Sequence, residues 1–208
     1  MSEKFWDKIA GRYAKQPIAD QASYEKKLEI TRGYFHPDTQ VLEFGCGTGS
    51  TAISHAPFVN HIRAIDVSEK MLEIARKRAG AAGVSNVAFE RSTIEAMQAP
   101  DGSFDVVLGL SILHLLENKD AAIEKVYRML KPGGVFITST VCLGGSITRV
   151  IEWVAPIGRL LGLMPMVRAF TADQLEGCLT KAGYTIEHRW QPGKNKAVFI
   201  VAKKSADG

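Results

Sequence analysis

The sequence predicts an α/β fold, a doubly wound seven-stranded sheet that is mostly parallel and ends in an antiparallel hairpin. From residue 40 onward, apolar runs alternate with amphipathic stretches in the order expected of a parallel sheet. Residues 41–49, VLEFGCGTG, indicate a strand, a glycine loop and the start of a helix. Near the end of the chain, QPGKN at 191–195 has the turn residues that join two antiparallel strands.

The predicted elements follow in order along the chain. Apolar and aromatic residues recur at helical spacing before the sheet, and KPGG at 131–134 is expected to end one helix and begin a strand. Thr171 and Gln174 form a capping box that starts the last helix. The expected helices are 5–15, 21–35, 49–55, 69–82, 119–130 and 172–182, and the expected strands are 41–44, 61–65, 87–90, 104–110, 135–140, 184–190 and 196–202.

Length and composition fit one soluble domain. The chain has 208 residues, of which 46% are hydrophobic and 23% charged. We divide the domain into N-terminal cap helices over 1–36, a core over 37–141, a helical insertion over 142–170, and a last helix with the hairpin over 171–208.

Charge and cysteine usage argue against several classes of protein. The net charge is +4 and no long basic block occurs, so a nucleic-acid partner is not expected. Cys46, Cys142 and Cys178 lack CxxC spacing, which predicts neither a disulfide framework nor a metal site. No run of about 18 apolar residues and no apolar signal core are found, so we expect no transmembrane segment and a cytoplasmic location.

The glycine loop predicts a ligand site. Gly45, Gly47 and Gly49 lack a Cβ, so the backbone can lie against a bound molecule at the start of a helix, where N–H groups are free. The dinucleotide fingerprint GxGxxG fits only in part, because Ser50 stands where its third glycine should be. This disfavours a nicotinamide oxidoreductase.

Asp66 ends the second predicted strand, in AIDVS, beside the glycine loop. A carboxylate at this position can accept hydrogen bonds from both ribose hydroxyls of an adenosine. The alternative is that Asp66 caps the next helix, although Ser68 is available for that role.

The segments EFGCGTG, AIDVS, FDVVLGLSILHLL and RMLKPGGVFIT occur in this order over about residues 40 to 140. The series resembles the class I S-adenosylmethionine-dependent methyltransferases with small-molecule or lipid-like acceptors. The resemblance implies a Rossmann-like fold, S-adenosylmethionine as the cofactor, and methyl transfer by in-line displacement. Alignment of the reactants is the main demand of that chemistry, so a catalytic residue is not obligatory.

The resemblance also implies roles for single residues. Glu43 faces the amino group of the cofactor, Tyr13 covers its methionine end, and Met71 packs on the adenine, although both Tyr13 and Met71 would also serve as ordinary core residues. Thr93 and Ile94 are expected to bind the adenine. The family usually has an acid at the position of Thr93, which accepts from the adenine amino group. The remaining expected cofactor contacts are Gly45, Cys46, Gly47, Gly49, Asp66, Val67 and Leu110.

His114 matches a histidine that often follows the fourth strand in small-molecule methyltransferases. The resemblance implies a general base, whereas a lone histidine in an apolar stretch is more often structural. Residues 142–170 are apolar nearly all round and are interrupted by Arg149, Glu152 and Arg159. In the resembled family this segment caps the acceptor, while a homodimer interface, a core extension and contact with a membrane surface are the alternatives.

Two other functions stay open from the sequence. An RNA or other nucleic-acid methyltransferase is disfavoured because GLSI, not an Asp/Asn-Pro-Pro-aromatic motif, follows the fourth strand. A non-catalytic protein that only binds S-adenosylmethionine would be signalled by a damaged glycine loop or by the loss of Asp66, and the sequence has both features intact.

Overall fold

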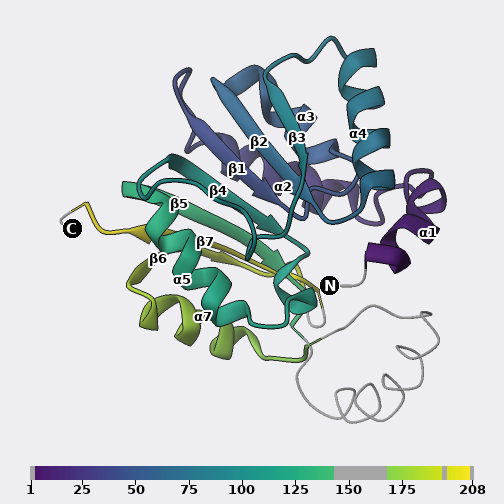
Figure 1. Cartoon of the computed structure of the whole chain (residues 1–208). Coiled ribbons are helices and arrows are strands. Elements are labelled where there is room, and N and C mark those ends of the chain that lie inside the picture. The colour runs from purple at the N-terminus through teal and green to yellow at the C-terminus, as the bar shows by residue number, and fades with distance from the viewer. Residues whose placement is uncertain (1–2, 143–167, 194–195, 207–208) are drawn as a thin grey trace.

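The computed structural model describes residues 3–142, 168–193 and 196–206. Its centre is a seven-stranded sheet in the order β3-β2-β1-β4-β5-β7-β6, in which β7 runs in the opposite direction to the other six strands. This is the predicted sheet with its terminal antiparallel hairpin (Figure 1). The strands are β1 (Gln40–Phe44), β2 (His61–Asp66), β3 (Val87–Arg91), β4 (Phe104–Leu110), β5 (Leu130–Thr140), β6 (Tyr184–Trp190) and β7 (Val198–Lys204).

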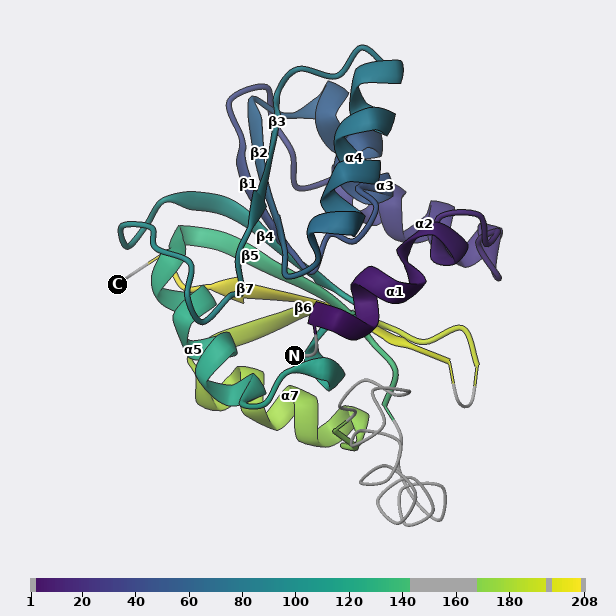
Figure 2. The same ribbon diagram turned by 45° about the vertical axis from the view of Figure 1, so that its right-hand side comes forward.

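Helices cover both faces of the sheet, as Figure 2 shows. One face carries α2 (Gln21–Arg32), α3 (Ser50–His55) and α4 (Glu69–Ala81), and the other carries α5 (Lys119–Met129) and α7 (Ala172–Lys181). The first helix, α1 (Glu3–Tyr13), packs on α4. Short 3-10 turns, η1 (Ala56–Phe58) and η2 (Leu113–Leu115), follow α3 and β4.

Alternation along the central strands builds two apolar cores. On β1, Val41 packs into the core under α3 and α4, whereas Leu42 and Phe44 pack into the core under α5 and α7. Neighbouring side chains of a strand point to opposite faces, so a strand covered on both faces is apolar at nearly every position. Gln40 at the partly exposed start of β1 and Glu43 are its polar residues, and Glu43 is only 3% exposed.

Most predicted boundaries agree with the structure to within three residues. The capping box is confirmed, because the Thr171 hydroxyl accepts from the Gln174 N–H at 3.1 Å and the Gln174 side chain accepts from the Thr171 N–H at 2.9 Å. Helix α2 ends at Arg32, three residues earlier than expected, with Gly33 at its C-cap. The predicted helical cap over 142–170 lies almost wholly outside the described residues.

Strand β5 corrects the prediction, because it begins at Leu130 and not after KPGG. Leu130 pairs with Phe104, and the register shifts before the next pair, so KPGG forms an irregular first part of the strand. Gly133 has φ +75°, and a Cβ on Gly134 would lie 2.9 Å from the backbone oxygen of Asp105. These glycines therefore permit a bulge and a close approach of two backbones within the strand, whereas the expectation placed them before it.

The sheet order places a topological switch point between β1 and β4. The chain leaves β1 toward β2 on one side, and β4 and β5 are added on the other side. In open α/β sheets, ligands bind outside the carboxyl ends of the strands at this point. The glycine loop after β1 and the end of β4 at Leu110 therefore mark the expected position of a site.

Within the described residues, no helix has the length and apolar character needed to cross a membrane. The same part of the chain contains no cluster of three or more His, Cys, Asp or Glu side chains that could hold a metal ion.

Gly109 in β4 gives a test of the packing. A Cβ there would lie 2.6 Å from the Cζ of Phe44, and the Phe44 ring stacks on Phe136 in the core. We expect Gly109→Ala to lower the free energy of unfolding by about 1–3 kcal/mol, as overpacking does. Gly177→Ala in α7 meets no heavy atom within 4 Å and should raise it by about 0.5–1 kcal/mol. Urea denaturation of both variants checks this, and equal effects would contradict the packing described.

Candidate cofactor site

Two cavities flank the glycine loop at the switch point. A small one of about 70 Å³ is lined by Asp66 and Met71, and a large one of about 990 Å³ is lined by Glu43. The residues that line both are Tyr13, Gly45, Gly47, Leu110 and Ser111. The loop and the end of β4 therefore form the boundary between the two spaces.

Glycine is required at the three loop positions for different physical reasons. All have positive φ, +69° at Gly45, +54° at Gly47 and +76° at Gly49, a region that costs other residues strain. A Cβ on Gly45 would lie 2.7 Å from the Ile112 side chain, and one on Gly49 would lie 2.9 Å from Ala75 Cβ. A Cβ on Gly47 meets only Tyr13, at 4.0 Å. Gly47 therefore presents its backbone to the cavities, whereas the other two glycines allow the loop to pack on the protein.

Asp66 is tied to the loop by backbone amides. Its Oδ2 accepts from the Gly47 N–H at 2.9 Å, and its Oδ1 accepts from the Ser68 N–H at 2.9 Å. Burial raises the pKa of Asp66 and these amides lower it, with a net upward shift. The Ser68 hydroxyl accepts from the Met71 N–H and so caps α4. The capping role that competed for Asp66 thus belongs to Ser68.

Glu43 is a buried acid in the wall of the large cavity. Burial, and secondly the charge of Asp66, raise its pKa to about 8, while a hydrogen bond with the backbone of Ala52 in α3 opposes the shift. Its Oε2 is buried and has no hydrogen-bond partner among the described residues. Glu43 thus contacts the first turn of α3 through one oxygen and has its other oxygen available for a ligand.

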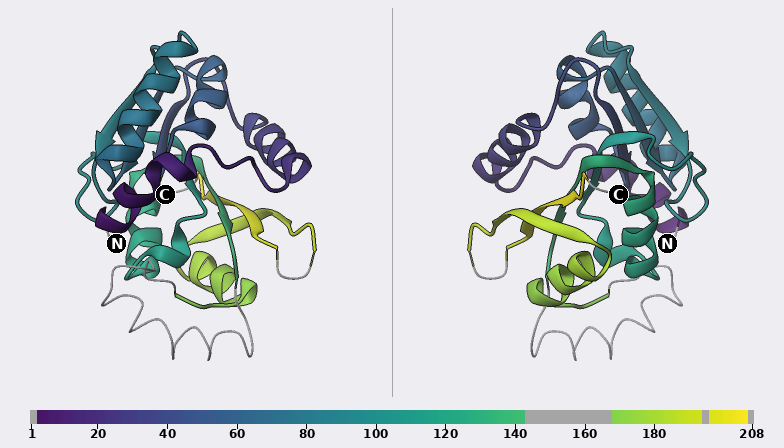
Figure 3. Two further views of the ribbon diagram at one scale, coloured as in Figure 1. Left: turned by 90° about the vertical axis from the view of Figure 1, so that its right-hand side faces the viewer. Right: turned by 90° about the vertical axis from the view of Figure 1, so that its left-hand side faces the viewer.

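Helix α1 closes the small cavity. Trp6 and Tyr13 line it, and their rings meet edge to face with centroids 6.4 Å apart. Figure 3 (left) shows α1 crossing between α4 and α5. Burial, and then the charge of Asp66, raise the pKa of Tyr13. Met71 is 2% exposed and lines the same cavity, next to Asp66.

Polar contacts fix α1 over the site. Asp7 accepts from the Ser68 hydroxyl at 2.6 Å and from the Lys70 N–H at 3.2 Å. Arg78 of α4 donates to the Thr48 hydroxyl at 2.8 Å and to the Ala14 carbonyl at 2.6 Å. One arginine thus joins the glycine loop to the end of α1.

Five expected site residues line neither of these cavities: Gly49, Val67, Thr93, Ile94 and His114. The Thr93 hydroxyl accepts from the Ala96 N–H at 3.1 Å, and Ile94 and Val67 are core residues. His114 has a buried Nδ1 without a partner among the described residues, and burial lowers its pKa. The adenine contacts and the general base stay predictions. Cys46, by contrast, lines the large cavity, and burial raises the pKa of its thiol.

Ser111, which the family resemblance places with Gly109 and Leu110 beneath the sulfonium of the cofactor, lines both cavities. It has φ +57° and is the only described residue other than glycine with positive φ. Its N–H donates to the Ser139 carbonyl at 2.6 Å, which ties the end of β4 to β5. Strained backbone of this kind concentrates at functional sites. Neither the residue type nor its neighbours in LGLSI carry a signal for this conformation.

The raised pKa of Glu43 predicts how stability depends on pH. A carboxyl that stays protonated up to about pH 8 in the folded protein, but ionises near 4.5 when unfolded, makes stability fall as the pH rises through this window. Each tenfold change in its acid dissociation constant corresponds to about 1.4 kcal/mol. We expect Glu43→Gln to lose less free energy of unfolding than the wild type between about pH 5 and pH 8. Urea denaturation across this range measures it, and parallel pH profiles would contradict the assignment.

Known proteins match this chain in sequence and in fold. Residues 41–134 match the family model for a methyltransferase domain. The uncharacterized methyltransferase YcgJ of Bacillus subtilis is 35% identical over 110 residues, which cover 53% of this chain and 44% of that protein. A demethylmenaquinone methyltransferase of Leptospira interrogans is 36% identical over 128 residues, covering 59% of this chain and 49% of that protein.

A solved structure has the same fold over nearly the whole chain. The S-adenosylmethionine-dependent methyltransferase of Thermotoga maritima has a TM-score of 0.72 at 22% identity, with 98% of this chain and 100% of that chain covered. The alignments to the curated relatives span about half of those proteins' length. These matches show that residues 41–134 form a methyltransferase domain and that the chain has the fold of the S-adenosylmethionine-dependent methyltransferases, with the glycine loop and the acids beside it at the switch point of the sheet.

Proposed function

We propose that this protein transfers the methyl group of S-adenosylmethionine to a small, largely apolar acceptor. The observation that carries the proposal is the buried Glu43 oxygen without a partner among the described residues, which lies in the cavity wall beside the glycine loop and near a second acid, Asp66. An unsatisfied buried acid is costly unless a ligand completes it. A ligand with a positive charge at one end and hydroxyls at the other would supply partners for Glu43 and for Asp66.

The residues present fit S-adenosylmethionine. Glu43 would hold the cationic amino group, Gly47 would let the backbone approach the methionine end, and Asp66 would accept from the ribose hydroxyls. The cavity beside Asp66 is narrow because Trp6 and Tyr13 of α1 close over it. These two aromatic side chains, with Met71, would shield the nucleoside from water.

When bound, the cofactor supplies a methyl group already activated on a sulfonium. The contribution of the chain is then to orient both reactants and to exclude water, and orientation alone can lower a barrier by roughly 7 to 11 kcal/mol. Leu110 and Ser111 line both cavities, so they lie where the two reactants would meet. A proton-accepting role for His114 remains a prediction.

The large cavity suits an apolar acceptor. Its volume of about 990 Å³ lies at the upper end of the usual range for small-molecule sites. Pro17, Ile18, Ala19, Leu28 and Ile53 supply apolar lining. The relative from Leptospira interrogans bears the name of a demethylmenaquinone methyltransferase, and such a substrate is also apolar. A cytoplasmic location, a homodimer and contact with a membrane surface stay predictions.

Calorimetric titration with S-adenosylmethionine, S-adenosylhomocysteine and NAD tests the cofactor. Micromolar binding of the two adenosyl compounds without binding of NAD is the expected result. Binding of NAD alone, or of none of the three, would contradict the proposal. Transfer of a labelled methyl group to apolar hydroxyaromatic acceptors would then separate an enzyme from a non-catalytic binding protein, and transfer to RNA alone would favour the nucleic-acid alternative.

Asp66→Asn tests the ribose contact. Loss of two charge-assisted hydrogen bonds, each worth roughly 1.5 to 3 kcal/mol, should weaken S-adenosylhomocysteine binding by on the order of a hundredfold or more. Glu73→Gln is the control. Glu73 pairs with Lys70 on the exposed face of α4, so its loss should leave the affinity for S-adenosylhomocysteine unchanged. Calorimetry of both variants decides the matter, because equal affinity in Asp66→Asn and wild type would refute the contact.

A further inference from the structure

The end of the large cavity away from the glycine loop contains a lysine bound only to a neutral partner. Lys27 of α2 lines this cavity, and its Nζ donates to the Ser139 hydroxyl at 2.9 Å. Ser139 lies near the carboxyl end of β5 and is 2% exposed. No ion pair with Lys27 is formed by the described residues.

The charged groups nearest to Lys27 do not neutralise it by contact. The charge of Asp20 acts on Lys27 without a hydrogen bond between the two side chains. The Asp20 carboxylate instead accepts from the N–H and the hydroxyl of Ser23. Asp20 also lies 3.8 Å from the Nζ of Lys196. Burial outweighs the charge of Asp20 and lowers the pKa of Lys27. An ammonium group that is partly desolvated in this way gains from an anionic partner.

A second polar group on α2 also lacks a partner. Tyr24 precedes Lys27 by three residues, so both side chains lie on the same side of the helix, and both line the large cavity. The Tyr24 hydroxyl oxygen is buried without a hydrogen-bond partner among the described residues. A hydroxyl and an ammonium on one helix face thus provide two donors toward one space.

Along the edge of the sheet, strand β4 lies between these donors and the glycine loop. The glycine loop follows β1, and Ser139 lies on β5, with β4 between them. Two strand spacings amount to about 10 Å. Ser139 is level with Leu110, the residue that lines both cavities. Lys27 therefore lies beyond the end of β4, on the side of the cavity that the cofactor would leave to the acceptor.

We propose that Lys27 and Tyr24 bind an anionic oxygen of the methyl acceptor, either a carboxylate or a phenolate, and so orient its apolar ring toward Leu110 and Ser111. The inference rests on the proposed function and adds the class of acceptor to it. Ser139 positions the ammonium group, and a bound anion would share it. Charge-assisted hydrogen bonds of this kind are stronger than neutral ones and give the acceptor a fixed direction.

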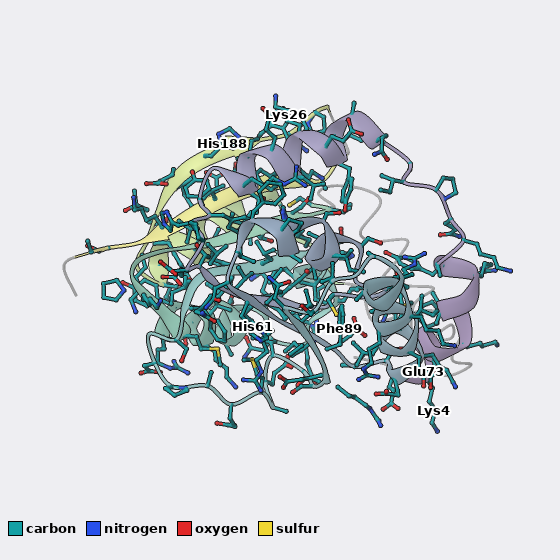
Figure 4. All side chains as sticks on the ribbon, turned by 90° about the horizontal axis from the view of Figure 1, so that it is seen from above. Lys4, Lys26, His61, Glu73, Phe89 and His188 are labelled. Carbon is teal, nitrogen blue, oxygen red and sulfur yellow. The ribbon has the colours of Figure 1, made fainter. Side chains whose placement is uncertain are left out.

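The test uses the full chain saturated with S-adenosylhomocysteine. Calorimetry measures the affinity for 2-naphthoate and for its neutral counterpart 2-naphthamide, and for 4-nitrophenolate and its neutral counterpart 4-nitroanisole. The first pair reports a carboxylate site and the second a phenolate site. The variants are Lys27→Gln, Lys27→Arg and, as the matched control, Lys26→Gln. Lys26 is a neighbouring lysine of α2 that stacks over Trp190, and Figure 4 labels it on the outer rim of the molecule.

We expect the wild type and Lys26→Gln to bind at least one anionic probe about tenfold more tightly than its neutral counterpart. Lys27→Gln should lose this preference while its affinity for S-adenosylhomocysteine stays unchanged, and Lys27→Arg should keep much of it. Unchanged thermal midpoints would show that α2 is intact.

Three results would overturn the inference. If the wild type prefers neither anion, Lys27 only joins α2 to β5. If Lys27→Gln weakens S-adenosylhomocysteine and leaves the probes unaffected, Lys27 serves the cofactor instead of the acceptor. If the wild type binds no S-adenosylhomocysteine at all, the proposed function itself fails, and this outcome is distinguishable from the other two.

Discussion

A buried acid and a half-buried acid at the carboxyl ends of adjacent strands are the constraint on which this site depends. Folding brings Glu43 of β1 near Asp66 of β2, and the charge of Asp66 contributes to the raised pKa of Glu43. Backbone amides compensate only in part, with the N–H groups of Gly47 and Ser68 donating to Asp66. A cationic ligand would offset the remaining cost of ionising Glu43 beside Asp66. The same arrangement that destabilises the free protein at high pH therefore prepares it for a positively charged cofactor.

Polar contacts hold the glycine loop and α1 beside this pair. Arg78 joins the glycine loop to the end of α1, and Asp7 joins α1 to the start of α4. On the other side of β4, the polar groups are the hydrogen-bond donors Lys27 and Tyr24 of α2 in place of acids. The large cavity is therefore lined by the acid Glu43 beside the loop and by the base Lys27 beside β5, while Arg78 at the loop end donates to the Thr48 hydroxyl and the Ala14 carbonyl. This polarity would orient a cationic donor and an anionic acceptor toward each other.

The sequence predicted the sheet and its terminal hairpin because those features depend on local signals. Apolar runs, the capping box at Thr171 and the glycine loop are all readable over a few residues. The early start of β5 was missed, because glycines that permit a bulge have the same appearance as glycines that permit a turn. The predicted cap over 142–170 lies almost wholly outside the described residues. The loop residues, Asp66 and the place of Ser111 after the fourth strand could be predicted from motif spacing. The positive φ of Ser111 and the place of Lys27 depend on contacts between β4, β5 and α2 that no local pattern encodes.

The most direct measurement is the number of protons released when S-adenosylhomocysteine binds, obtained by calorimetry at pH 7 in two buffers of different ionisation enthalpy. The pKa of Glu43 is about 8 in the free protein, so the carboxyl is mostly protonated at pH 7 and must ionise to hold an ammonium group. The wild type should therefore release close to one proton, and Glu43→Gln should release almost none. Binding without proton release in the wild type, or equal release by both proteins, would contradict the role of Glu43 at the centre of this account.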